Sequence, residues 1–389
     1  MENYKANEAK LKSISDKIWG KIDGIHIKEN KFGKGKVFCE MTFNEVFAKL
    51  NINPDFSYIG SSKSSNVQFI HKRLGQQDVY FISNQNDYPE ELICTFRVHG
   101  KAPEIWNPEN GTTQKLGIYK LSSNETTLPV RLEGKGSVFV VFSKKSENPV
   151  VSLSRNNVSL FPVFNQHSSF AQTPNYFISE DSAKQWTLSK SGVYDFQLDD
   201  CTKHSLNVPA IPSDLILYGK WMVSFQKGRN APEKVEFDSL IALNNHLNPQ
   251  IKYFSGIATY TKEINLSIPF FEQEKELILE LGELHDMASV KINGRELGVV
   301  WIKPYQINLT KVLKPGNNII EIEIANSWAN RIIGDLQLPK NDRITWSNSL
   351  NSFSGWGKYN KLYTPESPLV ASGLLGPVIL KTVIKKSTK

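Results

Sequence analysis

The segment Leu92-Ile-Cys-Thr-Phe-Arg-Val98 decides the fold class, because alternate side chains along it are apolar. Successive side chains of an extended strand point to opposite faces, so a period of two predicts a half-buried strand. The two faces carry different residues, with Leu92, Cys94, Phe96 and Val98 on one and Thr95, Arg97 and His99 on the other. Segments of this kind, separated by turn residues, predict a small antiparallel β-sandwich with strands at 67–74, 78–84, 90–99, 126–133 and 137–143.

The same alternation returns in the last third of the chain. The residues predicted to face inward are Leu277, Leu279, Leu281, Ile320, Ile322 and Ile324. The residues between them that are expected to face solvent are Glu276, Glu280, Glu321 and Glu323. Asn293-Gly294 separates two further strand segments and is the favoured two-residue hairpin turn. Strands this regular, joined by aromatic-rich loops, predict a jelly-roll sandwich.

The first 60 residues follow a different pattern. Residues 4–19 have apolar side chains at helical spacing and Gly20 ends the predicted helix. Residues 36–39 predict a short strand, and Thr42 and Glu45 have the capping-box spacing of a second helix. One short strand with two helices cannot bury both faces of a sheet, so this part is predicted to be the remnant of an α/β domain.

The predicted fold class is mainly β, with tandem β-sandwiches after a short α/β fragment. Residues 148–212 are rich in Ser, Asn and Pro and show short strands at 150–154, 158–164 and 193–198. Four parts are therefore predicted: an α/β remnant at 1–60, a small sandwich at 61–147, a β-rich connector or partial sandwich at 148–212, and a jelly roll at 213–389.

Composition and charge exclude several classes of protein. In the 389 residues, 40% are hydrophobic and 22% charged, which is typical of a globular chain. No apolar stretch approaches the roughly 18 residues of a membrane span. The basic residues behind the net charge of +7 are scattered, so nucleic acid is not an expected partner. The concentrated basic run is predicted to be a solvated tail and consists of Lys381, Lys385, Lys386 and Lys389.

Cofactor and metal motifs are missing from the sequence. The three cysteines cannot build a disulfide scaffold and have no zinc spacing. No Gly-rich phosphate loop follows a strand, and no acidic loop has calcium-binding spacing. We therefore predict no cofactor and no metal site, while a calcium ion held by backbone carbonyls stays open.

The order of the C-terminal motifs resembles a known sugar-binding fold. The motifs are Gly256–Tyr260, Leu279–Glu283, Val290–Gly294, Leu313–Asn317 and Ile322–Asn326. Together they resemble the sugar-binding jelly roll of family 2 glycoside hydrolases. The resemblance implies that 213–389 is a galactose-binding-like domain.

A more detailed resemblance covers nearly the whole chain. Two sets of motifs are similar, in order, to the C-terminal region of glycoside hydrolase family 106: upstream Phe69–Arg73, Val79–Asn84, Trp106–Gly111 and Gly136–Phe142, and downstream Val299–Tyr305, Asn326–Asp335 and Leu369–Val378. This family implies α-L-rhamnosidase activity on rhamnose-containing glycans. It also implies an N-terminal (β/α) barrel with the catalytic carboxylates, followed by β-sandwiches.

This chain differs from that family pattern at its start. It shows no eightfold βα alternation, for which a barrel needs about 200–250 residues. We therefore expect the catalytic barrel to be missing and the gene to be truncated, although Met1 as a true start stays open.

The first 20 residues lack the apolar core of a signal peptide, so the chain alone is expected to stay in the cytoplasm. Full-length relatives are expected to be exported.

Glycoside hydrolysis needs two carboxylates roughly 5–10 Å apart. The candidates on loops are Glu104, Glu109, Asp286, Asp335 and Glu366. Each is better explained as a solvated or turn-capping residue, and Glu109 lies in an Asn-Pro-Glu-Asn-Gly turn. The family's catalytic pair belongs to the barrel. No catalytic residue is therefore assigned in this chain, and whether it is an enzyme stays open.

Two aromatic-polar stretches have the composition of a sugar site, in which rings stack on C–H groups and polar groups bond hydroxyls. The first consists of Trp301, Lys303, Tyr305, Asn326, Trp328, Asn330 and Arg331. The second consists of Trp346, Asn348, Asn351, Phe353, Trp356 and Tyr359. The first stretch supplies two strand ends that could converge at one rim. The alternative is that this rim packs against the barrel.

Three functions follow from these alternatives. The leading one is the accessory, sugar-binding part of an α-L-rhamnosidase-like glycoside hydrolase, without glycosidase activity of its own. The second is an autonomous carbohydrate-binding module, which requires Trp301, Trp328 and Trp356 to be exposed. The third is a scaffold subunit that docks on a separate barrel through an apolar face near residues 1–57. The glycan and the oligomeric state stay open.

Overall fold

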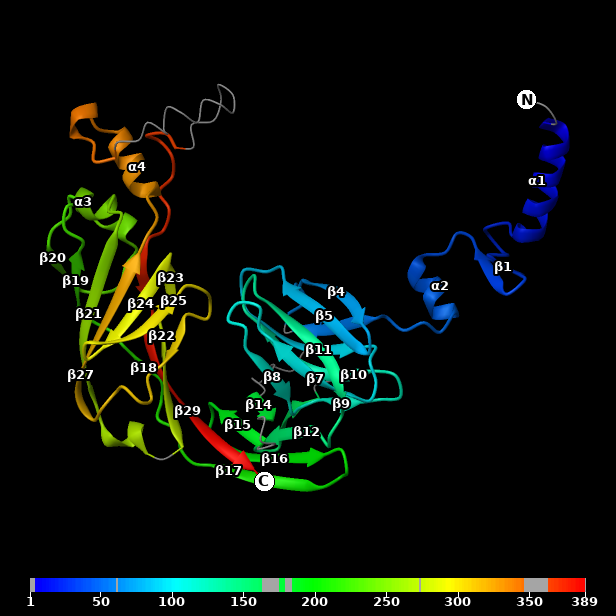
Figure 1. Cartoon of the computed structure of the whole chain (residues 1–389), viewed down its shortest axis with the longest axis horizontal. Helices are drawn as coiled ribbons and strands as arrows, with labels where there is room; N and C mark the ends of the chain where they lie inside the picture. Colours follow the sequence, from blue (N-terminus) through cyan, green and yellow to red (C-terminus); the bar gives the residue numbers. More distant parts are fainter. Residues whose placement is uncertain are drawn as a thin grey trace. The chain divides into compact units, whose positions relative to one another are not determined.

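Figure 1 shows the computed structural model, which describes residues 4–60, 62–162, 175–178, 184–272, 274–345 and 363–388. Most elements are strands, arranged in several antiparallel sheets. The predicted fold class, mainly β with tandem β-sandwiches, is confirmed. The chain divides into two compact units, of which the first comprises Met1–Ser57 and Thr95–Arg97 and the second the remainder. The finer division into four domains stays a prediction.

The first unit contains a hairpin and two helices. Its elements are α1 (Tyr4–Trp19), β1 (Glu29–Phe32), β2 (Gly35–Phe38) and α2 (Phe43–Lys49). Both predicted helices are present, and the short strand predicted at 36–39 is the second arm of the β1–β2 hairpin. At the start of α2, Thr42 Oγ1 accepts from the Glu45 N–H at 3.3 Å, and the Glu45 carboxylate accepts from the Thr42 N–H at 2.7 Å. The predicted capping box is therefore formed.

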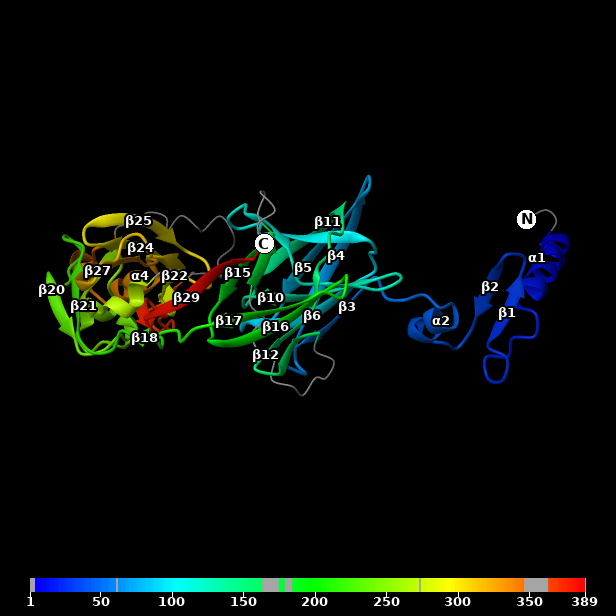
Figure 2. The same ribbon diagram turned by 90° about the horizontal axis from the view of Figure 1, so that it is seen from below.

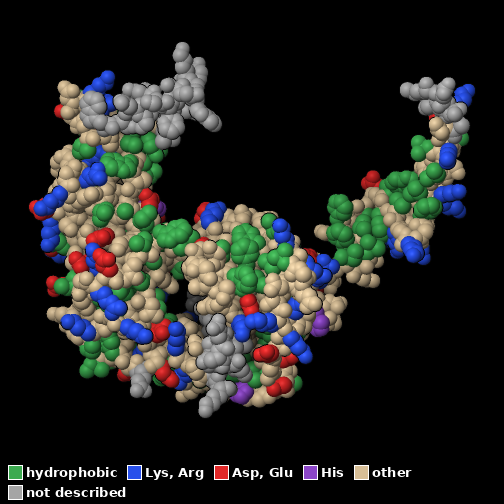
Figure 3. Space-filling view, viewed as in Figure 1, with side chains coloured by type: hydrophobic (Ala, Val, Ile, Leu, Met, Phe, Trp, Pro, Cys, Tyr) green, Lys and Arg blue, Asp and Glu red, His purple; other side chains and the backbone are tan. Residues whose placement is uncertain are grey.

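The first unit buries little apolar surface. Among the described residues before Ser57, Phe56 is the one hydrophobic side chain that is buried. Large apolar side chains are exposed instead, namely Leu11, Ile14, Trp19, Ile25, Ile27, Phe32, Phe43, Phe47, Leu50 and Ile52. Figure 3 shows hydrophobic side chains along the surface of this part. A globular unit of this size normally turns such residues inward, so this surface is suited to contact another apolar surface.

A small sandwich follows in the chain, and its strands are β3 (Phe56–Gly60), β4 (Val67–Leu74), β5 (Gln77–Asn84), β6 (Glu90–Phe96), β7 (Lys101–Trp106), β8 (Thr113–Leu116), β9 (Lys120–Leu121), β10 (Thr126–Leu132) and β11 (Ser137–Lys145). Of these, β4, β5, β6, β10 and β11 lie close to the predicted positions, whereas β3, β7, β8 and β9 were not predicted. One sheet has the order β3-β6-β10-β9, and the strands β8-β7-β11-β5-β4 end a larger sheet. Leu92, Cys94 and Phe96 are buried, as their alternation predicts.

One residue of β6 departs from the simple alternation. Ile93 is expected on the solvent face of a half-buried strand, yet only 5% of it is exposed. It packs in a hydrophobic cluster with Val150, Leu153 and Phe161 of the next part of the chain. Both faces of β6 are therefore covered, because a second layer of strands packs on the face that the pattern left to solvent.

This next part is the middle sandwich, formed by β12 (Val150–Arg155), β13 (Val158–Phe161), β14 (Asn175–Ile178), β15 (Lys184–Leu188), β16 (Gly192–Leu198) and β17 (Lys203–Val208). Figure 2 shows β12, β16 and β17 side by side, in agreement with the sheet order β13-β12-β16-β17. Trp186 and Leu188 of β15 lie in the same hydrophobic cluster as Ile93. The chain segment predicted as a connector or partial sandwich thus has strands and buried side chains of its own.

The C-terminal sandwich contains the strands from β18 onward. They are β18 (Leu215–Ile216), β19 (Trp221–Phe225), β20 (Lys234–Phe237), β21 (Ile257–Leu266), β22 (Lys275–Glu280), β23 (Glu283–His285), β24 (Met287–Ile292), β25 (Arg295–Val300), β26 (Gln306–Asn308), β27 (Gly316–Ala325), β28 (Gly373–Gly376) and β29 (Ile379–Thr388). A six-stranded sheet has the order β20-β19-β21-β27-β24-β25, and β26-β22-β29 belong to another sheet. The residues Leu277, Leu279, Leu281, Ile320, Ile322 and Ile324 fill the core, as predicted.

Short helices lie in the connections of this sandwich. They are η1 (Leu243–Asn245), α3 (Pro249–Lys252), η2 (Ile268–Phe271), α4 (Ala329–Leu336) and η3 (Lys340–Asp342). In Figure 1, α3 and α4 lie at the same end of the strands. No helix within the described ranges is both long and apolar enough to span a membrane.

The basic residues near the C-terminus form part of a strand. Lys381, Lys385 and Lys386 lie on β29, which pairs with β22 and β15. Their ammonium groups pair with carboxylates, in the order Glu280, Glu276 and Glu274. The predicted solvated tail is therefore wrong for these residues, because apolar residues between the lysines draw the segment into a sheet. Glu276 and Glu280 are partly buried ion-pair partners rather than free solvent-facing groups.

Candidate functional site

The predicted sugar-site residues follow two strands whose ends lie at one edge of the six-stranded sheet. Ala325 at the end of β27 is paired with Met287 at the start of β24. Ala288, the next residue of β24, is paired with Val300 at the end of β25. Neighbouring strands are about 4.8 Å apart, so the ends of β25 and β27 lie about 10 Å apart on either side of β24. We call this edge the rim and define it by residues 283–287, 300–305 and 325–331.

Two tryptophans of the rim are exposed. Trp301 follows β25 and has 58% of its surface exposed, while Trp328 precedes α4 and has 43% exposed. The guanidinium carbon of Arg229 lies 4.6 Å from the centroid of the Trp328 ring, a cation–π contact. Val299, near the end of β25, is also exposed. Sequence reasoning missed Arg229, because it is distant from the rim in the chain.

Lys303 and Tyr305 follow Trp301 on the connection to β26. Lys303 is exposed and Tyr305 is half-buried. Burial raises the pKa of the Tyr305 hydroxyl, and the nearby carboxylates of Asp286 and Glu283 raise it further. The hydroxyl therefore stays protonated at neutral pH and can donate a hydrogen bond. Glu283 Oε1 lies 3.2 Å from His285 Nε2, which places a carboxylate and an imidazole ring at the rim.

The two asparagines of the predicted site hold the fold together. Asn326 accepts from the Gly256 N–H at 2.8 Å and donates to the Phe254 carbonyl at 3.0 Å. Asn330 is 1% exposed; its amide donates to the Val370 carbonyl at 2.8 Å and its oxygen accepts from the Val370 N–H at 2.9 Å. Both amides are thus engaged by backbone groups distant in the chain.

Arg331 is likewise an internal residue. It is 4% exposed, donates to the Arg229 carbonyl at 3.0 Å, and its Nη1 lies 3.6 Å from Asp335 Oδ1. Burial lowers the pKa of Arg331, and the carboxylate of Asp335 acts in the opposite direction. The other oxygen of Asp335 accepts from the N–H groups of Ile344 at 3.1 Å and Thr345 at 2.6 Å. This buried pair therefore fixes α4 and the chain that follows it.

Of the first predicted stretch, four residues stay at the surface of the rim: Trp301, Lys303, Tyr305 and Trp328. The other three, Asn326, Asn330 and Arg331, serve the fold. The second predicted stretch, from Trp346 to Tyr359, lies outside the described residues. The rim thus presents two exposed aromatic rings with a cation, a phenol and carboxylates around them, which is a composition suited to sugar hydroxyls and C–H groups.

Two of the carboxylates predicted on loops lie in regular elements instead: Glu104 is on β7, where it pairs with Val141 of β11, and Asp335 is buried on α4. Glu104 accepts from Trp106 Nε1 at 3.0 Å. Glu109, expected to be a solvated turn carboxylate, is half-buried, and burial followed by the nearby Glu133 raises its pKa. Glu109 is therefore not a freely solvated turn carboxylate, because the protein covers part of its surface. Within the described part of the chain, no group of three or more His, Cys, Asp and Glu residues is placed to hold a metal ion.

The known proteins that this chain is similar to are glycosidases. Residues 2–121 match the sequence model of the alpha-L-rhamnosidase family, glycoside hydrolase family 106. The whole chain is 23% identical to a protein of Formosa agariphila whose name proposes a beta-glucuronidase. The solved rhamnosidase of Novosphingobium sp. PP1Y covers 97% of the chain at 28% identity, with a TM-score of 0.65. The chain is a glycosidase-related protein.

The chain spans 48% of the Formosa protein and 29% of the Novosphingobium enzyme. The similarity to rhamnosidases stated from the sequence motifs is therefore confirmed at the level of the family model for 2–121 and of the fold for nearly the whole chain. Glycosidases of both kinds named here act on carbohydrates.

Proposed function

We propose that this chain is the accessory, sugar-binding part of an α-L-rhamnosidase-like glycoside hydrolase that acts on rhamnose-containing glycans. The observation that carries the proposal is the fold match over 97% of this chain to a rhamnosidase of which the chain covers only 29%. In this reading 213–389 is a galactose-binding-like jelly roll, and the catalytic carboxylates belong to a (β/α) barrel.

The rim supports a carbohydrate ligand. Exposed Trp301 and Trp328 offer flat apolar rings, and Lys303, Tyr305 and Glu283 offer donors and acceptors at the same edge. A ring of this size is normally turned inward, since burying it stabilises a fold by a few kcal/mol. Two exposed tryptophans after the ends of β25 and β27, on either side of β24, therefore favour a ligand or a partner surface over a purely structural role.

The first test is catalysis. The purified chain is incubated with p-nitrophenyl α-L-rhamnopyranoside, and release of p-nitrophenol is followed over hours at micromolar protein. We expect no turnover above the buffer rate, because the proposal assigns no carboxylate pair of this chain to the reaction. Turnover that persists after repeated purification, and that disappears in a carboxylate variant, would refute a purely accessory role.

The second test is binding at the rim. A rhamnose-containing oligosaccharide is titrated into the wild type and into Trp301→Ala, with calorimetry or ligand-observed NMR as readout. We expect the variant to bind about tenfold more weakly, a loss of roughly 1.4 kcal/mol. Trp19→Ala is the matched control, because Trp19 is 45% exposed but lies in the first unit. Equal affinities of all three proteins would exclude Trp301 from the site.

The exposed apolar surface of the first unit favours a second function, docking of this chain on a separate (β/α) barrel subunit. Phe43 is 80% exposed and lies beside Phe47 on α2, with ring centroids 6.3 Å apart. Co-elution of the chain with a rhamnosidase barrel in size-exclusion chromatography tests this function. Phe43→Ser with Phe47→Ser should abolish co-elution. Rhamnose binding without a barrel, by contrast, supports an autonomous carbohydrate-binding module.

A further inference from the structure

The middle sandwich carries a cavity, separate from the rim, with a volume of about 410 Å³. This volume lies within the range of about 300–1,000 Å³ that small ligands occupy. Nine residues line it: Arg155, Asn156, Ser189, Lys190, Ser191, Ile211, Pro212, Ser213 and Asp214. They come from the end of β12, the β15–β16 connection and the segment after β17. We call this cavity the basic pocket.

The walls of the basic pocket are fixed by hydrogen bonds. Asn156 Oδ1 accepts from the Val193 N–H at 2.9 Å, which ties the turn after β12 to β16. The hydroxyl of the buried Tyr194 donates to the Lys190 carbonyl at 2.8 Å. Gly192 has a φ of +135°, and a Cβ there would lie 2.7 Å from Asn156 Oδ1, so only glycine allows this close approach. The backbone that carries the lining side chains is therefore held in place.

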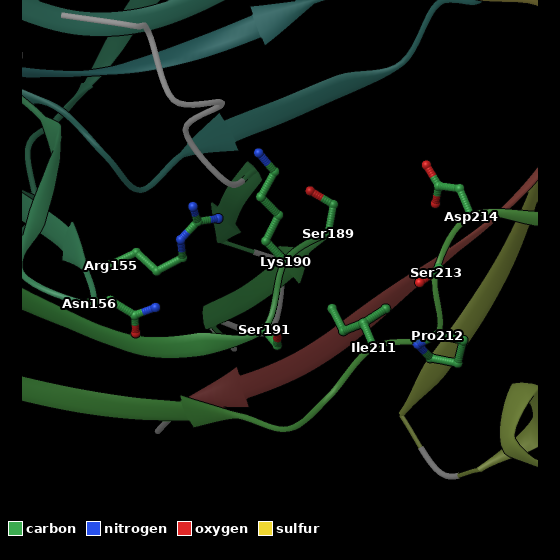
Figure 4. Close-up of a pocket in the computed structure, with 9 residues that line it drawn as sticks. All are labelled: Arg155, Asn156, Ser189, Lys190, Ser191, Ile211, Pro212, Ser213 and Asp214. Atoms are coloured by element: carbon green, nitrogen blue, oxygen red, sulfur yellow. The ribbon is translucent and has the colours of Figure 1, made fainter.

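Two cations extend into this pocket. Figure 4 shows the side chains of Arg155 and Lys190 reaching the same part of the pocket, with Asp214 on the facing side. Arg155 is half-buried and lies across the strand pair from Tyr194. Within the part of the chain that the structure describes, neither cation has a carboxylate as an ion-pair partner. Two such cations at one cavity favour an anionic group, which arginine binds with two parallel hydrogen bonds.

The remaining lining residues fit a sugar rather than a bare anion. The hydroxyls of Ser189, Ser191 and Ser213 and the Asp214 carboxylate can bond ring hydroxyls as donors and acceptors. Ile211 and Pro212 add an apolar wall for C–H groups. We propose that the basic pocket binds an acidic sugar, whose carboxylate or sulfate group pairs with Arg155 and Lys190. The inference takes from the proposed function only that the ligand is a carbohydrate.

The test uses the full chain and three probes in calorimetry at low salt. The trimer of galacturonic acid carries the carboxylates, its full methyl ester has the same shape without charge, and sodium sulfate supplies an anion without a sugar. We expect the acid to bind at least tenfold more tightly than the ester and than sulfate. If sulfate binds as tightly as the trimer, the pocket holds a free anion and the sugar assignment is overturned.

Variants then place the binding in the pocket. Arg155→Gln and Lys190→Gln should each weaken binding of the trimer about tenfold, and Arg155→Lys, which keeps the charge, should lose less. Lys203→Gln is the matched control, because it removes an exposed lysine of the same sandwich outside the pocket. Unchanged affinity in both Gln variants would overturn the inference. Trp301→Ala should bind the trimer normally, so failure of the rim proposal and failure of this inference are distinguished.

Discussion

Asn330 shows how a residue with the chemistry of a sugar ligand can instead serve the fold. Its amide forms two hydrogen bonds with the backbone of Val370, which lies 40 positions later in the chain. The carboxamide therefore joins α4 to the segment that leads to β28 by the same pair of hydrogen bonds that two backbone strands would form. Because Asn330 is 1% exposed, its polar atoms are already desolvated in the free protein.

Replacing Asn330 with alanine should lower the free energy of unfolding by about 2 kcal/mol, because backbone groups of Val370 lose their partners. Urea denaturation followed by tryptophan fluorescence measures this loss. Asn265→Ala is the control, since Asn265 is exposed on β21 and should change stability by less than about 0.5 kcal/mol. Unchanged stability with weakened sugar binding would instead return Asn330 to the ligand site.

Asp78 is a second residue whose role is set by its surroundings. The side chain is buried and accepts from Lys101 Nζ at 2.7 Å and Arg73 Nε at 2.9 Å, with His71 Nε2 at 3.3 Å. Burial alone would raise the pKa of Asp78, but the hydrogen bonds from Lys101 and Arg73 outweigh it and lower the pKa. The ionised carboxylate therefore joins β4, β5 and β7.

Because the pKa of Asp78 is lowered in the folded protein, its contribution to the free energy of unfolding decreases as the pH falls. The stability from Asp78 is fully present above the unfolded pKa of about 3.9 and is lost as the pH falls through the lower folded value. Asp78→Asn should cost about 2 kcal/mol at pH 7 and flatten the loss of stability below pH 4. Urea midpoints between pH 3 and 7 measure both effects. Asp87→Asn, at a side chain that is 89% exposed, should reproduce the wild-type profile.

At the scale of the element, the β24–β25 hairpin depends on two adjacent residues in the left-handed region. Asn293 has a φ of 52° and Gly294 a φ of 80°. Positive φ at both central positions is the geometry whose twist matches the flanking strands. The side chain of Asn293 also accepts from the Ile319 N–H at 2.9 Å, which ties the turn to β27. The hairpin is therefore defined locally and anchored by one neighbour.

Gly294→Ala should lower the free energy of unfolding by about 1 kcal/mol, because an L-residue in the left-handed region is strained. A Cβ at Gly294 meets no atom within 4 Å, so the effect comes from the backbone alone. Gly294→Asn is the matched variant and should cost less, since asparagine tolerates this region better. Thermal unfolding of the three proteins ranks them; an equal loss in both variants would contradict the backbone explanation.

At the scale of the whole molecule, the two units differ in how they are stabilised. The second unit has hydrophobic clusters that include Trp186 in the middle sandwich and Trp221 in the C-terminal one. The strand β29 pairs with strands of both of these parts, so the C-terminus belongs to the framework. The first unit has the exposed apolar side chains described above and a single buried one, Phe56, among its described residues before Ser57.

Deletion of residues 1–52 should therefore leave the melting temperature of the remaining protein within about 2 °C of the full chain, because the removed residues bury little apolar surface. It should also lower the fluorescence of a dye that binds apolar surface. Phe56 and its contact with Phe96, at 5.1 Å between ring centroids, are kept in this variant. A fall of more than about 5 °C would show that the first unit stabilises the second.

Local features of the sequence determined much of the fold. The period of two placed β4, β5, β6, β10 and β11 of the small sandwich and β22 and β27 of the C-terminal sandwich within a few residues, because alternation is a property of the strand itself. The capping box at Thr42 and the turn at Asn293 were likewise predictable, since each is completed by neighbours within about three residues. The similarity to rhamnosidases was visible in the sequence because the motifs that carry it are short, local segments.

Only the tertiary structure decided which polar residues face a ligand. The residue types of Asn326, Asn330 and Arg331 are those of a sugar site. Their hydrogen-bond partners, however, are backbone groups 40 to 102 positions away in the chain. The basic pocket around Arg155 and Lys190 is formed by three separate segments and left no motif. Whether a polar group is free or engaged depends on contacts between distant segments, and local periodicity carries no information about these contacts.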